Sequence, residues 1–197
     1  MELPVYELLI NEDVNDDAEV NFVSLVDRPA IQKNYNAFKD KVNLQIASED
    51  RRIISGPIML ADTPIYRNDN HHGEYYVVFS KDTIYKIVQK YFKKGFQNNV
   101  NLDHSQDLIQ EDVYVFETFI TDAERGILPM KGFEDAPDGS WFGSMYVGND
   151  NTWAEVKAGK YKGFSVEGIF EYSQKKKADN YIDIMESIKK ILSQVKW

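Results

Sequence analysis

The chain has 197 residues, 43% of them hydrophobic and 28% charged, which is typical of one compact globular domain. Its net charge of −9 disfavours binding to nucleic-acid phosphates. The lack of cysteine excludes disulfides, thiolate metal sites and a cysteine nucleophile. The three histidines, at 71, 72 and 104, lack metal-site spacing, so we expect no metal and no cofactor. No run has the length of a membrane span and the first residues lack a signal-peptide pattern, so we expect no membrane partner and a cytoplasmic location.

Short strands dominate the first third of the chain. The acidic segment 11–19 is too polar to pack and predicts a solvated loop, and Pro29 ends the strand before it. Apolar and β-branched residues, in an imperfect alternation, predict four strands here. These strands cover residues 5–10, 20–26, 44–47 and 53–60.

The clearest helix follows a predicted strand at 75–79. Ser80 suits the N-cap and Gly95 suits the position after the last turn. Between them, apolar residues recur at a spacing of three and four, which predicts one buried stripe. The stripe consists of Ile84, Ile87, Val88, Tyr91 and Phe92. The helix immediately precedes the His104 segment and should position it.

The remainder of the chain predicts further strands and two more helices. Strands are expected at 113–120, 141–147 and 163–172, and a capping box at 152–155 predicts a short helix. Residues 175–197 carry an amphipathic stripe. We therefore predict an α+β fold, a small, mostly antiparallel β-barrel of about seven strands with surrounding helices. The predicted domain spans 1–174, followed by a C-terminal helix at 175–197.

Ser165 and His104 are the candidate catalytic pair. Serine is a weak nucleophile at neutral pH unless a base such as histidine accepts its proton. On a strand, Ser165 shares one face with Glu167, while Phe164 and Val166 point to the other. From residue types alone, a strand serine that fills a small space and a solvated loop histidine explain the same residues.

Three segments together carry a resemblance to a known family. They are His104 with the acidic residues after it, the GFSVEG sequence at 163–168, and the SLVDRPA sequence at 24–30. Over roughly residues 18–172 the chain resembles the prohead (capsid maturation) proteases of tailed bacteriophages, above all their XkdF-like branch. That family in turn resembles the herpesvirus assemblin fold, a serine protease built on a small barrel.

The resemblance implies a serine endopeptidase with Ser165 as nucleophile and His104 as general base. Its substrates would be the scaffold and major capsid proteins, inside the assembling procapsid in the host cytoplasm, with retention in the virion as a further option. Assemblin-like proteases dimerise through helices, so the C-terminal helix is a candidate homodimer contact as well as a candidate for packing on the barrel.

The chain departs from the family in the third catalytic group, the residue that orients the imidazole. A Glu-[Val/Ile]-Ser segment normally follows the serine strand, whereas here the matching segment is N-terminal and begins with Phe22. This order predicts a circular permutation in which 20–26 pairs with 163–172. Asp27, Glu167 and Asp103 remain candidates for orienting the imidazole, and a Ser-His dyad is an alternative.

Two functions of other classes compete with the protease. Phe22 in place of glutamate favours a catalytically inactive, protease-like structural or cargo protein of the virion. A small-molecule-binding barrel has no supporting motif. A short separation between Ser165 and His104 would favour the enzyme.

Overall fold

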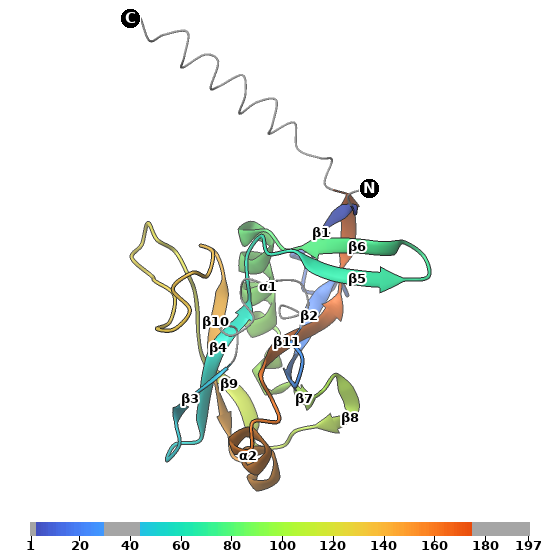
Figure 1. Ribbon diagram of the computed structural model, residues 1–197. Coiled ribbons are helices and arrows are strands. Elements are labelled where there is room, and N and C mark those ends of the chain that lie inside the picture. The colour runs from blue at the N-terminus through green and yellow to red at the C-terminus, as the bar shows by residue number, and fades with distance from the viewer. Residues whose placement is uncertain (1–2, 30–43, 175–197) are drawn as a thin grey trace, which may run out of the picture.

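The computed structural model describes residues 3–29 and 44–174, in which strands predominate (Figure 1). In these two ranges the helices are α1 (Lys81–Lys93) and α2 (Asp150–Lys157), together with the 3-10 turn η2 (Phe96–Asn98). The strands are β1 (Val5–Leu9), β2 (Glu19–Val26), β3 (Gln45–Ser48), β4 (Ile53–Met59), β5 (Ile65–Asp69), β6 (Gly73–Val78), β7 (Val100–Leu102), β8 (Ser105–Ile109), β9 (Val113–Ile120), β10 (Trp141–Val147), β11 (Gly163–Ile169) and β12 (Glu171–Gln174).

The strands form three four-stranded sheets, in the orders β12-β1-β6-β5, β3-β4-β10-β9 and β11-β2-β7-β8. The predicted barrel with surrounding helices is therefore wrong: the described residues hold three open sheets and only two α-helices, with 45% of residues in strands. A barrel closes only when every strand has a partner on both sides. Here each sheet keeps two edges; in particular, β11 lies near β4 without a ladder between them.

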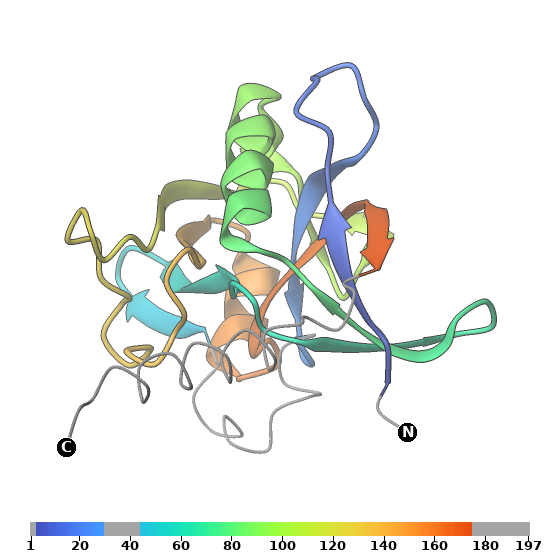
Figure 2. The ribbon, with the colours of Figure 1, turned by 90° about the horizontal axis from the view of Figure 1, so that it is seen from above.

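Helix α1 packs between two of the sheets. It lies against β2 (Figure 2), and the Tyr91 ring meets the Trp141 ring of β10 edge-on at 5.4 Å. Its predicted start is confirmed, because Ser80 accepts a hydrogen bond from the Thr83 N–H. Gly95 follows the helix with a φ of 75°, as predicted for that position. The apolar stripe of α1 and residues of all three sheets form one continuous core.

The main departures from the predicted elements are short or polar segments. Residues 65–78 form the β5–β6 hairpin, which projects from the body (Figure 1), where only one strand and a polar loop were expected. The long strand predicted at 163–172 is divided into β11 and β12. Helix α2 starts after Asn149, three residues before the predicted cap. The predicted helix at 175–197, with its dimer contact, lies outside the described residues.

The predicted pairing between the N-terminal segment and the serine strand is confirmed. β2 runs antiparallel to β11 and parallel to β7, so it is a central strand that joins two distant parts of the chain. The circular permutation itself stays a prediction.

Candidate active site

Three adjacent strands place polar side chains in one row. Ser165 of β11 pairs with Ser24 of β2, and Ser24 pairs with Asn101 of β7. Paired residues of neighbouring strands project on the same face, so these three side chains lie next to one another. The alternate residues Val23 and Leu25 are completely buried in the core. This sheet therefore has one apolar face and one polar face.

His104 stands at the tip of the β7–β8 hairpin. Leu102 pairs with Ser105, so Asp103 and His104 form a two-residue turn. Their φ values are 50° and 61°, and a type I′ hairpin turn requires positive φ at both positions. Residues other than glycine adopt this conformation at a cost, and such residues cluster at functional sites. The Asp103 N–H donates to the Leu25 carbonyl at 2.9 Å, which holds the turn against β2.

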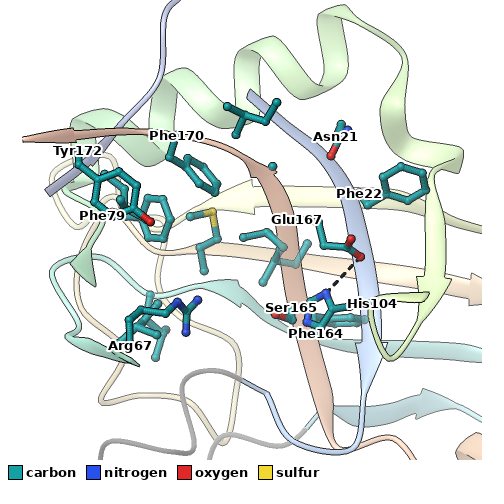
Figure 3. A pocket seen from close by; sticks show the side chains of 18 residues that line it. Asn21, Phe22, Arg67, Phe79, His104, Phe164, Ser165, Glu167, Phe170 and Tyr172 are labelled. Carbon is teal, nitrogen blue, oxygen red and sulfur yellow. Dashed lines mark ion pairs between the residues drawn. The ribbon is translucent and has the colours of Figure 1, made fainter. Parts of the chain in front are cut away.

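The imidazole of His104 contacts the carboxylate of Glu167. Its Nδ1 lies 3.1 Å from Glu167 Oε1 (Figure 3) and 3.2 Å from Ser24 Oγ. The Ser24 hydroxyl donates its own proton to the same Glu167 oxygen, at 2.6 Å. Both neighbours of Nδ1 therefore act as acceptors, which assigns the ring proton to Nδ1. Nε2 is then the atom with a free lone pair.

Glu167 is held in its ionised form. Its Oε1 accepts hydrogen bonds from Ser24 Oγ and Asn101 Nδ2, both at 2.6 Å. Burial raises the pKa of Glu167, but the hydrogen bonds from Ser24, Asn101 and His104 together outweigh it and leave the pKa below its ordinary value of 4.5. The carboxylate is therefore charged at neutral pH and can stabilise a protonated imidazole.

Phe22 occupies the place where the family resemblance leads one to expect glutamate. In the β2–β11 ladder, Phe22 is the direct partner of Glu167. The carboxylate that β2 lacks is thus supplied from the paired position of the neighbouring strand. The departure at Phe22 does not leave His104 without an acidic partner.

Ser165 lines a cavity of about 560 Å³, together with His104 and Glu167 (Figure 3). Ser165 is 9% exposed, whereas Ser24 is 0% exposed and does not line the cavity. Ser24 thus has the hydroxyl that contacts the imidazole at Nδ1, whereas Ser165 is the serine that lines the cavity. The lining of the cavity also includes the apolar side chains of Ile58, Met59, Ile65, Phe79 and Phe170.

The other two candidate orienting groups make different contacts. Asp27 Oδ1 accepts a hydrogen bond from Lys162 Nζ at 2.6 Å, which lowers the pKa of Asp27. Asp103 Oδ1 accepts from the Asp27 backbone N–H at 3.2 Å. The structure thus brings Glu167 to His104 and turns both aspartates to other partners.

The remaining histidines lie elsewhere. His71 and His72 are in the β5–β6 turn, where their backbone N–H groups donate to Asp69. Within residues 3–29 and 44–174, no three His, Cys, Asp or Glu side chains are grouped so that they could bind a metal ion. In the same part of the chain, no helix has the length and apolar character needed to cross a membrane.

Sequence reasoning missed two members of this site, Ser24 and Asn101. Ser24 is separated from Glu167 by 143 positions and Asn101 by 66, so strand pairing alone brings them together. A signal existed in the sequence, because each of the two is a polar residue between apolar neighbours in a strand. It is weak, since a buried serine is common in any strand.

Comparison with protein families matched residues 41–174 to the family described as "Putative phage serine protease XkdF". The matched range contains His104, Ser165 and Glu167, and β2 lies before it. Searches of curated proteins and of solved structures gave no match. Because the match covers more than half of the sequence, and its residues meet in one site, the chain belongs to the XkdF family of phage serine proteases.

Proposed function

We propose that the chain is a serine endopeptidase with Ser165 as nucleophile, His104 as general base and Glu167 as the residue that orients the imidazole. One observation carries this proposal. Glu167 holds His104 Nδ1 at 3.1 Å beside the cavity that Ser165 lines. In the well-known triads, a carboxylate at Nδ1 leaves Nε2 to act on the serine hydroxyl, and this arrangement fits that division of roles.

The reaction proceeds in two halves. Ser165 Oγ attacks the scissile carbonyl carbon while its proton passes to His104 Nε2, and the protonated ring is stabilised by Glu167. The ring then gives this proton to the leaving amine, the C–N bond breaks, and an acyl ester on Ser165 remains. A water molecule attacks the ester, again with His104 as base, and its proton returns to Ser165 as the ester bond breaks.

The free edge of β11 supplies a donor for the oxyanion. The Val23 N–H and the Leu25 carbonyl make their hydrogen bonds on the β7 side of β2. Because successive residues of a strand point their backbone groups to opposite sides, the backbone groups of Ser24 face β11. In this register, the backbone of Ser165 faces β2 and that of Val166 faces the free edge. The N–H groups of Phe164 and Val166, on either side of the nucleophile, are therefore used by no ladder, and we assign that of Val166, the residue after the nucleophile, to the oxyanion.

Ser24 serves this mechanism as a positioning residue. Its hydroxyl already donates to Glu167 at 2.6 Å, and the side chain has no exposed surface. A peptide carbonyl could reach it only if the sheet opened. Ser165 lies on the same face and lines the cavity, so it fits the nucleophile better.

The biological substrates in this proposal are the scaffold and major capsid proteins of the phage, cleaved inside the assembling procapsid in the host cytoplasm. Membership of a phage serine protease family supports this setting. The alternative, an inactive structural or cargo protein of the virion, was favoured by Phe22. The contact between Glu167 and His104 removes that reason.

Co-expression with the scaffold and capsid proteins of the same phage tests the proposal. We expect the wild-type chain to cleave at least one of them, and Ser165→Ala to cleave neither while folding normally. Ser173→Ala, which changes an exposed serine of β12, is the matched control and should behave as the wild type. Full processing by Ser165→Ala would refute the assignment of the nucleophile.

A further inference from the structure

Arg67 is a cation in the wall of the cavity that the mechanism does not use. It comes from β5, and it lines the same cavity as Ser165 and His104. Figure 3 shows Arg67 on the opposite side of β11 from His104 and Glu167. A ligand that reaches Ser165 from the free edge of β11 therefore enters the space between this edge and Arg67.

The guanidinium of Arg67 has no acidic partner among the described residues. Its side chain makes one hydrogen bond, from Nη1 to the Tyr66 carbonyl at 3.2 Å. Asp69, two residues along the same strand face, instead accepts from the Tyr75 hydroxyl at 2.6 Å and from backbone N–H groups. Arginine carries five N–H donors in a planar fork that suits a carboxylate, so most of this capacity is open to a ligand.

The free edge of β11 suits an extended peptide. No strand of the described residues pairs with this edge, and the backbone groups of Phe164 and Val166 point toward it. The carbonyl of Lys162, at the start of the same edge, already accepts a hydrogen bond from the Leu44 N–H at 3.0 Å. A peptide added here as a further strand would use main-chain hydrogen bonds for affinity and alternate side chains for selectivity.

We propose that Arg67 is a specificity-determining residue, which binds an acidic side chain of a peptide that lies extended along β11. This inference rests on the proposed function, because it places the peptide at the nucleophile. The acidic side chain meets the guanidinium, and the apolar wall formed by Ile58, Met59 and Phe79 accepts an apolar neighbour.

The overall charge of the chain does not conflict with this selectivity. The net charge of −9 acts over long distances, favours basic segments of a partner and is screened by salt. Arg67 acts at one position, through short contacts inside the cavity. The substrate that suits both is a segment with one carboxylate near the cleaved bond and basic residues farther away.

Matched peptides test the proposal. One series of fluorogenic octapeptides carries a single Glu at each position in turn, and a second series carries Gln there. For the wild type we expect a kcat/KM about tenfold higher for Glu than for Gln at one position, as for a charge-assisted hydrogen bond partly exposed to water. Arg67→Gln should bring this ratio close to one, and Arg67→Glu should invert it in favour of a Lys peptide. Arg51→Gln, in the exposed β3–β4 turn, is the matched control.

The outcomes separate the two proposals. A Glu preference that persists in Arg67→Gln, or the absence of any Glu preference in the wild type, would overturn the role of Arg67. Failure of a fluorophosphonate probe to label Ser165 would instead overturn the proposed function. Binding of the same peptides to Ser165→Ala, followed by fluorescence anisotropy, reports the role of Arg67 without catalysis.

Discussion

Replacing Glu167 by glutamine should remove its charge while keeping its shape. All three hydrogen-bond contacts of the carboxylate use Oε1, so the amide oxygen of Gln can accept from Ser24, Asn101 and His104 in the same positions. What disappears is the attraction between the carboxylate and the protonated ring. A hydrogen bond to a charged group contributes about 1.5–3 kcal/mol. At about 1.36 kcal/mol per factor of ten, kcat should fall roughly 10- to 150-fold.

Glu167→Ala should act differently, because it also removes the acceptor. Ser24 and Asn101 are both 0% exposed, so their donors would stay buried without a partner. Each such group costs about 1–3 kcal/mol, which gives a loss of roughly 2–6 kcal/mol in the free energy of unfolding. Peptide hydrolysis measures kcat, and urea unfolding measures stability. Glu171→Gln, on exposed β12, is the control. Wild-type kcat in Glu167→Gln would refute the role of the charge and leave a Ser-His dyad.

Three further predictions address the remaining groups. Ser24→Ala should keep fluorophosphonate labelling at Ser165 but lose about tenfold in rate, the value of one hydrogen bond to a charged group; labelling of Ser24 itself in the wild type would contradict this. His104→Ala should be inactive, and combining it with Ser165→Ala should add no further loss, since the two act as a unit; multiplying losses would argue against a shared mechanism. The pKa of Asp69 lies below its ordinary value of 3.8, chiefly because of the Tyr75 hydroxyl, so its contribution to stability is present above that pH and disappears as the pH falls below it. Asp69→Asn should therefore lower the unfolding midpoint at pH 7 and reduce its decrease between pH 4 and 2; parallel pH curves would count against it.

The segments with a strong periodic pattern were predictable. Helix α1 combines an apolar stripe with an N-cap serine and a terminal glycine, and each signal is local. β5 and β8 were missed because they are short and polar, and the pairing that makes them strands comes from a neighbour. The number of strands predicted from the sequence also does not indicate whether the sheets close into a barrel. β11 and β4 approach each other without pairing, and no pattern within either strand shows this.

The candidate site was predictable only in part. Ser165, His104 and Glu167 were identified, two of them from a resemblance and Glu167 from its place on the strand face of Ser165. Ser24 and Asn101 were not, because their roles depend on strand register between segments far apart in the sequence. The turn that presents His104 was hidden as well, since Asp-His is not a usual sequence for a type I′ hairpin.

The central position of β2 has a consequence for the timing of folding. β2 is made early, yet both of its neighbours in the sheet are made much later, and β11 is among the last described strands. Contacts between such distant segments form slowly, and here they need every residue from β2 to β11. A nascent polypeptide that ends before β11 contains His104 but neither Ser165 nor Glu167. The chain therefore acquires its complete site only after β11 has been synthesised, and a copy that stops before β11 has no means of cutting the proteins around it.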